Sequence, residues 1–311
     1  MTKQITNNII MVRPSNFGYN EQTAVNNSFQ TKDDSMLPSK IASKAIKEFN
    51  DFAKQLESKG IVVSVFDDIP DHKTPDAVFP NNWITTHENG MVISYPMFAP
   101  IRRLERRSDI IDMIKEKYQV EKDYTFEYYE EKDLFLEGTG SLILDRPNRI
   151  VYAAISPRTS IAILDKWCIL LDYRKIHFNA VDRNGDAIYH TNVMMALGED
   201  FVVICLDSIR NEHERSELET VFAATGKEII NISYDQMESF AGNMIQLQSV
   251  DGQKYLVMSK SAHESLTNKQ IEQIHKYSQI IVGNIPTIEK FGGGSVRCMI
   301  AENFLSPKHN E

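Results

Sequence analysis

The sequence has few cysteines, no long apolar run and no excess of positive charge. Its three cysteines, Cys168, Cys205 and Cys298, are too few for the disulfide framework of a small secreted protein. No segment approaches the roughly 18 to 20 apolar residues that a membrane-spanning helix needs. The formal net charge of −9 argues against a nucleic-acid partner, because phosphate binding needs clustered lysine and arginine. We therefore expect a small-molecule partner, with neither nucleic acid nor membrane involved, and we leave self-association into a homo-oligomer open.

The N-terminus also lacks the charged and then apolar pattern of a secretory signal, which predicts a cytoplasmic protein. A composition of 42% hydrophobic and 25% charged residues is typical of a globular chain. A length of 311 residues is enough for one large domain or two small ones, with a substantial core in either case.

Apolar, β-branched segments alternate with amphipathic segments along the whole chain. In the stretch 38–59 apolar residues recur at three- and four-residue steps, which predicts a helix that ends at Gly60. Further helices are expected near 103–118, 159–171, 212–225 and 267–277. Strands are expected at, among others, 8–12, 61–66, 126–130 and 149–155. The alternation of strands and helices indicates an α/β protein.

Five of the strand-like segments each carry one polar or reactive residue at an equivalent position: Asn82, Glu137, His190, Asn243 and Cys298. The intervals between them are 55, 53, 53 and 55 residues. Self-similarity at a fixed period is typical of a repeat architecture. If the repeats close into a ring, these positions converge on its axis. A thiol, an imidazole and a carboxylate would then meet as nucleophile, general acid/base and orienting group.

Cys298 follows a glycine-rich stretch in GGGSVRCM, which allows a tight turn and close approach of the backbone. These glycines precede a predicted strand, so they do not form a dinucleotide-binding loop. The neighbouring Arg297 is a candidate for stabilising the thiolate. Cys168 and Cys205 lie in apolar segments and are expected to be small buried hydrophobic residues.

Glu137 is flanked by apolar residues in LFLEGTGSLIL. A carboxylate in such surroundings needs a partner, because a buried unpaired charge is very costly. Pairing with His190 would account for both residues, although a histidine alone is more often a structural core residue. Cys298, His190 and Glu137 could instead bind zinc, but they lack the short spacing of common zinc motifs. We therefore expect no metal and no organic cofactor.

Segment 14–35 is polar and has no clear periodicity. A long loop in a compact domain is usually functional. We predict a lid over the axial pocket, with an inert surface loop as the alternative.

The motifs DAVFPNNW, LEGTGS, YHTNV and GGGSVRCM together resemble the guanidine-modifying enzyme superfamily, or penteins, over nearly the whole chain. This superfamily includes arginine deiminases, dimethylarginine dimethylaminohydrolases and amidinotransferases. The resemblance implies a single catalytic domain over 1–311, folded as a five-bladed α/β propeller of ββαβ repeats. It also implies that Cys298 is the nucleophile, His190 the general acid/base and Glu137 the partner of His190.

Further positions resemble the dimethylarginine hydrolases. Arg102 and Arg158 match arginines that bind the substrate α-carboxylate in that group, a role that suits a fork-shaped guanidinium. Asp76 matches an aspartate that contacts the substrate.

Three departures from the family pattern affect the expected substrate. Asn82 and Asn192 stand where related enzymes have aspartates, and Gly138-Thr139-Gly140 replaces a Gly-Gly-Asp motif. A buried guanidinium needs carboxylates, whereas asparagine suits a neutral ureido group. The chain thus resembles the bacterial citrulline-utilisation hydrolases most.

The sequence therefore predicts a cysteine-dependent hydrolase that cleaves a C–N bond of a ureido or guanidino amino acid through a covalent thiol adduct, with citrulline as the favoured substrate. A dimethylarginine hydrolase, an arginine deiminase, an amidinotransferase and a non-catalytic binding module are the alternatives. The sequence leaves open which nitrogen departs.

Overall fold

The computed structural model describes residues 2–33 and 35–308. Residues 1, 34 and 309–311 of the predicted domain, and hence one residue of segment 14–35, lie outside this description. The described residues form five three-stranded sheets. The sheets are β15 (Ala301–Glu302), β1 (Asn8–Arg13) and β2 (Val62–Asp67); β3 (Ile84–Thr86), β4 (Met91–Ser94) and β5 (Lys122–Thr125); β6 (Ile143–Asp145), β7 (Ile150–Ala154) and β8 (Arg174–Phe178); β9 (Met195–Leu197), β10 (Phe201–Ile204) and β11 (Glu228–Asn231); and β12 (Ile245–Gln248), β13 (Lys254–Ser259) and β14 (Gln279–Gly283).

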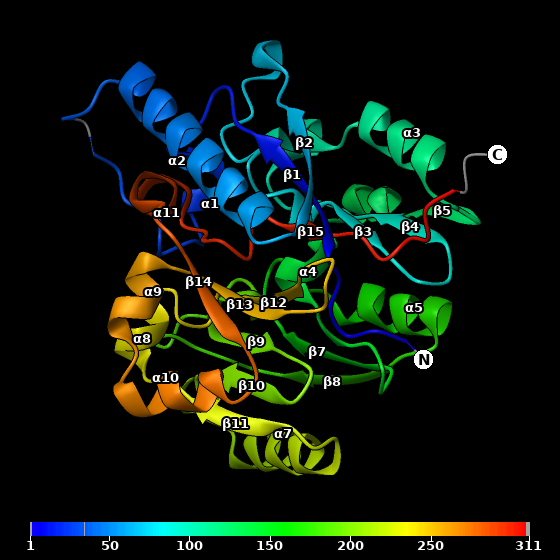
Figure 1. The fold of residues 1–311 in the computed structure, drawn as a ribbon, viewed down its shortest axis with the longest axis vertical. Coiled ribbons are helices and arrows are strands. Elements are labelled where there is room, and N and C mark those ends of the chain that lie inside the picture. The colour runs from blue at the N-terminus through cyan, green and yellow to red at the C-terminus, as the bar shows by residue number, and fades with distance from the viewer. Residues whose placement is uncertain (1, 34, 309–311) are drawn as a thin grey trace.

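Each sheet has the same internal design. A short inner strand pairs antiparallel with the middle strand, and the middle strand pairs parallel with the outer one. Parallel neighbours need a crossover connection, which helices provide here. The crossover helices are α2 (Pro38–Ser58), α3 (Ser108–Lys117), α5 (Ile161–Leu171), α7 (Glu212–Ala224) and α9 (Lys260–Ser265) with α10 (Asn268–His275). Figure 1 shows the sheets around a common centre with these helices outside, which confirms the predicted five-bladed α/β propeller.

The two ends of the chain share one sheet. Strand β15 pairs antiparallel with β1, where Ile9 lies opposite Glu302. The closing strand of each sequence repeat therefore belongs to the sheet of the next repeat. This offset joins the last repeat to the first and closes the ring.

Most of the expected elements are present, but three differ. The strand expected at 126–130 is a 3₁₀ helix, η4 (Glu127–Lys132), and the third strand of that sheet is β5 instead. The carboxylate of Glu130 accepts hydrogen bonds from the backbone of Met97 and from Arg106, which holds this turn against a neighbouring segment. The helix expected near 103–118 is divided into a 3₁₀ turn, η3 (Pro100–Glu105), and α3. Strand β2, expected to be buried, is half-exposed because it is an edge strand.

Shorter helices complete the described chain. They are α1 (Glu21–Ala24), η1 (Pro70–His72), η2 (Pro80–Asn82), α4 (Gly138–Ser141), α6 (Thr191–Met194), η5 (Leu206–Ser208), α8 (Tyr234–Glu238) and α11 (Pro286–Gly292). In residues 2–33 and 35–308, none of the helices has the length and apolar character that a membrane crossing requires.

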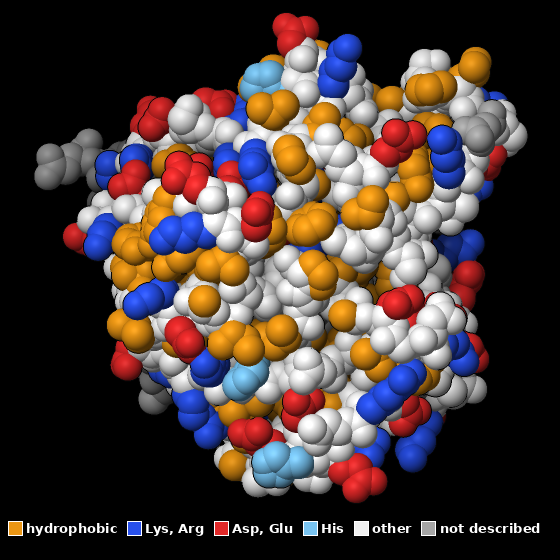
Figure 2. Space-filling model, turned by 180° about the vertical axis from the view of Figure 1, so that it is seen from behind, with side chains coloured by type: hydrophobic (Ala, Val, Ile, Leu, Met, Phe, Trp, Pro, Cys, Tyr) orange, Lys and Arg blue, Asp and Glu red, His pale blue; other side chains and the backbone are white. Residues whose placement is uncertain are grey.

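The apolar faces of the helices pack on the sheets. In α2 the buried residues are Ile41, Ala45, Phe49, Phe52, Ala53 and Leu56, which is the predicted apolar stripe. Cys168 and Cys205 lie in two other apolar clusters, as expected, and burial raises the pKa of each thiol to about 11. On the face shown in Figure 2, acidic and basic side chains alternate rather than gather into a patch of one sign.

The five equivalent residues lie just before the inner strands, whereas the sequence places them on strands. They are placed in the turns that lead into the inner strands, not on the strands themselves. Asn82 ends η2 before β3, and Glu137 and His190 immediately precede the one-turn helices α4 and α6. Asn243 and Cys298 lie in the turns before β12 and β15. These turns direct polar side chains towards the centre, while the strands remain apolar.

Candidate active site

The turns that carry the equivalent residues meet at one small cavity. Cys298, His190 and Asn82 line it. So do three of the predicted substrate-binding residues, Asp76, Arg102 and Arg158, together with Thr23 and Asn27 of segment 14–35 and Gly292, Gly293 and Gly294. The cavity volume is about 10 Å³, which is close to the space that a single water needs. This space is too small for an amino acid, so a substrate can bind only if part of this lining moves.

Glu137 and His190 form a buried pair. Nε2 of His190 lies 2.8 Å from Oε2 of Glu137, and the backbone N–H of Phe98 donates to the other carboxylate oxygen at 2.9 Å. A side chain at Gly140 would place its Cβ 2.8 Å from the His190 ring, so only glycine leaves room for the imidazole there. The sequence prediction that these two residues pair agrees with this geometry.

Charge determines the protonation of this pair. Burial alone would raise the pKa of Glu137, but the positive charge of Arg158, the hydrogen bond with His190 and the charge of Arg102 lower it to about 2. Burial lowers the pKa of His190 to about 4, although the hydrogen bond with Glu137 opposes that change. At neutral pH the carboxylate is therefore ionised and the imidazole neutral. Because the carboxylate only accepts, Nε2 carries the proton and Nδ1 is left basic.

Two side-chain amides face the thiol of Cys298. Nδ2 of Asn192 lies 3.4 Å from Sγ, and Nδ2 of Asn243 lies 3.2 Å from it. The orientation of Asn243 is fixed, because its Oδ1 accepts the backbone N–H of Arg297 at 3.1 Å. Two N–H donors therefore point at the sulfur. Among the described residues, Cys298 makes no hydrogen bond to His190, so the two groups border the cavity separately.

Arg297, the candidate for stabilising the thiolate, is bound to other acceptors. Its guanidinium donates to the carbonyl of Ile300 and to Glu302, both at 2.9 Å. These contacts fix the turn that follows Cys298 and leave the guanidinium engaged away from the thiol. The side-chain amides of Asn192 and Asn243 are the groups that donate to the sulfur.

Arg102 reaches the cavity but is already bound to protein acceptors. It pairs with the carboxylate of Glu105 at 2.8 Å and donates to Oδ1 of Asn82 at 2.9 Å. A further donor lies 3.3 Å from the carbonyl of Phe79. To bind a substrate carboxylate, this arginine would have to exchange some of these partners.

Arg158 is also engaged, in this case with segment 14–35. Its Nη2 donates to the carbonyl of Thr23 at 3.0 Å and its Nε to Oδ1 of Asn26 at 3.0 Å. The guanidinium also lies over the ring of Tyr189, 4.8 Å from its centroid. Its position couples the predicted lid to the site.

Three buried polar atoms of the predicted site residues have no hydrogen-bond partner within 2–33 and 35–308: Nδ2 of Asn82 and Oδ1 of Asp76, whose residues line the cavity, and Oδ1 of Asn192, which is not a lining residue. Arginine only donates, so the bond from Arg102 forces Oδ1 of Asn82 towards it and turns the NH₂ group the other way. The second oxygen of Asp76 accepts from Asn20 at 2.8 Å. Unpaired buried polar atoms are costly, and their grouping here indicates a place prepared for a polar ligand.

The comparison with protein families matches residues 13–305 to the model described as "N,N dimethylarginine dimethylhydrolase, eukaryotic". The chain belongs to this family. The match agrees with the pentein resemblance of the sequence motifs. No curated protein matches the chain.

Solved structures of similar fold support the same architecture. The N-terminal domain of ArgZ, described as an arginine dihydrolase from the ornithine–ammonia cycle in cyanobacteria, was solved as a cysteine-to-serine mutant bound to substrate. It is 15% identical, with a TM-score of 0.73 over 96% of this chain and 99% of that one. The chain spans 40% of the longer ArgZ apo structure. A histidine-to-glycine dimethylarginine dimethylaminohydrolase, solved as an adduct with S-methyl-L-thiocitrulline, is also 15% identical, with a TM-score of 0.62 over 97% and 100% of the two chains. Identities this low show the fold alone.

Some site residues of this family member were not predicted. Glu105 neutralises Arg102, and nothing in its local sequence distinguishes it. Thr23 and Asn26 hold Arg158 through a contact of more than 130 residues in sequence separation. Asn243 was recognised as an equivalent position of the repeat, but it was given no role. Its equivalent position in the repeat was the sequence feature that could have indicated a role at the site.

Proposed function

We propose that this pentein hydrolyses a C–N bond of a ureido or guanidino amino acid, with citrulline favoured, through a covalent adduct on Cys298. The substrate preference rests on two buried amide atoms without a partner: Nδ2 of Asn82, a residue that lines the cavity, and Oδ1 of Asn192, whose Nδ2 faces the thiol. Asn82 offers an N–H donor and Asn192 an oxygen acceptor. A ureido group presents one carbonyl oxygen and N–H groups, so it matches both. A guanidinium presents donors only and would leave the N–H of Asn82 unpaired.

In the first step the thiolate of Cys298 attacks the planar carbon of the ureido group, and a C–S bond forms. The N–H groups of Asn192 and Asn243 stabilise the sulfur before the attack. The proton of the Cys298 thiol passes to Nδ1 of the neutral His190, which becomes an imidazolium. His190 carries that proton to the departing nitrogen as the C–N bond breaks, because a neutral amine is the better leaving group.

In the second step a water molecule replaces the departed amine. Nδ1 of His190 accepts a proton from it, and the resulting hydroxide attacks the carbon and releases the thiolate of Cys298. Glu137 holds the imidazole by its Nε2–H and stabilises the transient imidazolium. Either nitrogen of the ureido group can serve as the leaving group with these residues.

A guanidino substrate is the second candidate, and Asp76 is the observation that favours it. This buried aspartate has one unpaired oxygen at the cavity and is available to a cation. The family description, a dimethylarginine hydrolase, agrees with such a substrate. Burial raises the pKa of Asp76, and Arg102 only partly offsets that effect, which weakens its hold on a cation.

The substrate is tested by kcat/KM for citrulline, arginine, methylated arginines and agmatine, with and without Asn82→Asp and Asn192→Asp. The wild type should prefer citrulline. The double variant should shift the ratio towards arginine by at least about 10-fold, because each carboxylate would pair with the cation and leave the ureido group facing unpaired charge.

Asn81→Asp is the matched control, since Asn81 is the adjacent buried asparagine, does not line the cavity and directs its Nδ2 to Thr139 instead of Cys298. It should leave the ratio unchanged. A wild type that prefers arginine or a methylated arginine would overturn the citrulline assignment. Release of product without an added amine acceptor would separate a hydrolase from an amidinotransferase.

We further propose that the chain forms one catalytic domain in which segment 14–35 is the lid. Thr31 donates its N–H to the carbonyl of Lys290 at 2.8 Å, and Asn26 accepts from Arg158. These polar contacts hold the segment beside the cavity, and Phe17 and Phe29 anchor it to two apolar clusters. In Cys298→Ala, saturating citrulline should slow tryptic cleavage after the exposed Lys32, because bound substrate favours the closed lid. An unchanged cleavage rate would contradict a lid.

A further inference from the structure

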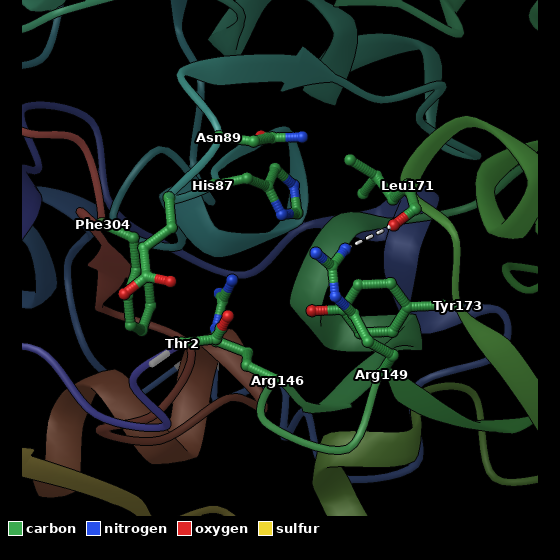
Figure 3. A pocket seen from close by; sticks show the side chains of 9 residues that line it. Thr2, His87, Asn89, Arg146, Arg149, Leu171, Tyr173 and Phe304 are labelled. Carbon is green, nitrogen blue, oxygen red and sulfur yellow. Dashed lines mark hydrogen bonds between the residues drawn. The ribbon is translucent and has the colours of Figure 1, made fainter.

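A second cavity lies away from the candidate active site and shares no lining residue with it. Its volume is about 250 Å³. It is bordered by the turns β3–β4 and β6–β7, by the end of α5 and by the terminal segments. The lining residues are Thr2, His87, Glu88, Asn89, Arg146, Arg149, Leu171, Tyr173 and Phe304 (Figure 3).

Arg146 is the central residue of this cavity. It is only 4% exposed, and its guanidinium lies 3.7 Å from the centroid of the Phe304 ring. The aromatic ring covers one face of the guanidinium, which leaves its N–H edges for hydrogen bonding. Within residues 2–33 and 35–308 the guanidinium has neither a hydrogen-bond acceptor nor an ion-pair partner. The guanidinium borders the cavity, so its hydrogen-bond acceptors have to come from what occupies that space, and an anion there would also compensate its charge.

Arg149 adds a second positive charge. Its Nη1 donates to the carbonyl of Leu171 at 2.9 Å, which fixes the side chain, and the guanidinium lies 5.7 Å from the Tyr173 centroid. Figure 3 shows both guanidinium groups and the ring of His87 facing the same space. The remaining N–H groups of Arg149 are available to a ligand there.

His87 contributes a neutral donor. Trp167 donates to the hydroxyl of Tyr95 at 2.9 Å, Tyr95 lies 2.7 Å from Oγ1 of Thr85, and Thr85 lies 2.9 Å from Nε2 of His87. If each hydroxyl in this series of hydrogen bonds donates to the next group, Nε2 of His87 accepts from Thr85. Nδ1 of His87 then carries the ring proton. Burial, together with the charges of Arg146 and Arg149, holds the pKa of His87 well below its usual value, so the ring stays neutral.

One carboxylate borders the same space. Glu88 is exposed at the rim, and its Oε1 accepts the backbone N–H of Lys3 at 3.0 Å. It disfavours an extended polyanion that would reach the rim. A compact anion held between the two arginines avoids this repulsion.

We propose that this cavity is a binding site for a small oxyanion, a carboxylate or phosphate group, held by the N–H groups of Arg146 and Arg149 and by Nδ1 of His87. Planar guanidinium groups bind such oxygens in a fork geometry. The proposal concerns binding, so it does not depend on the catalytic assignment.

The test measures thermal stability and calorimetric binding of the full chain with inorganic phosphate and with acetate, at an ionic strength kept constant with chloride. The wild type should show a saturable rise in Tm with one or both anions. The stronger of the two responses identifies the chemistry as phosphate or carboxylate. Arg146→Met keeps much of the packing on Phe304 and should weaken binding at least about 10-fold.

Arg215→Met, on α7 and outside the cavity, is the control and should bind as the wild type does. Arg146→Met should also be no less stable than the wild type without anion, because it removes an uncompensated charge. If Arg146→Met fails to fold, the test uses Arg149→Met, because Arg149 is exposed, and the same loss of anion affinity is expected. The absence of a response to both anions, or an equal response in Arg146→Met or Arg149→Met and in Arg215→Met, would overturn the proposal.

Discussion

Replacing Cys298 with alanine should lower kcat at least about 10³-fold and leave the fold intact. The thiol borders a cavity of only about 10 Å³ and faces two amide donors, so its loss removes the nucleophile while little core packing changes. Turnover is measured with the preferred substrate, and folding by the urea midpoint. In addition, an acid-quenched mass spectrum of the wild type should show a substrate-derived adduct that is missing in Cys298→Ala.

Two other cysteines provide matched controls. Cys168 and Cys205 are buried in apolar clusters, and burial raises the pKa of both thiols to about 11, so neither is a thiolate at neutral pH. Cys168→Ala and Cys205→Ala should therefore reduce stability and retain kcat. Full activity of Cys298→Ala would refute the covalent mechanism.

Replacing His190 with alanine should lower kcat at least about 10²-fold, which is the usual contribution of a general acid/base. The imidazole is 2% exposed and held by Glu137 at 2.8 Å, so no solvent group can take its place. Glu137→Gln should cause a smaller loss, because an amide can still hold the ring but cannot stabilise the imidazolium. A Glu137→Gln variant with wild-type activity would contradict the role given to the carboxylate.

The pH dependence of stability provides a second readout for His190. Its pKa is about 4 in the folded protein and near 6.5 when unfolded. Between these values the unfolded state binds a proton that the folded state does not, so stability present above pH 6.5 is lost as the pH falls. From pH 7 to pH 5 this group alone should cost the wild type about 2 kcal/mol. His190→Ala should lose less over the same interval, and an equal loss would show that the imidazole is not held neutral.

The repeat register was the most productive sequence observation. Residues separated by more than 100 positions, such as His190 and Cys298, could be brought together because each occupies the same place in a unit of strands and helix. The register was less informative about local structure. It placed these residues on strands, whereas they lie in the turns before them, since the strands are short and must stay apolar to pack.

Arginine roles were harder to predict. Arg102, Arg158 and Arg297 all lie near the centre, but each donates to a protein acceptor that the sequence did not identify. A buried arginine forms hydrogen bonds and ion pairs with the carboxylates and carbonyls that the fold places near it. Arg102 and Arg297 pair with residues three to five positions further along the chain, whereas Arg158 is held from segment 14–35 by residues more than 130 positions away.

The sequence by itself indicated the α/β class, the apolar stripes of the helices and the common register of Cys298, His190 and Glu137, because periodicity and hydrophobic pattern are local properties that repeat. Its motifs implied the five-bladed propeller by their resemblance to the penteins. Only the tertiary structure decided the protonation of the Glu137–His190 pair, the orientation of Asn82 and the place of Thr23 and Asn27 in the cavity lining. It alone also revealed the uncompensated charge of Arg146. These properties depend on burial and on distances between groups far apart in the chain, and both are fixed only when the ring closes.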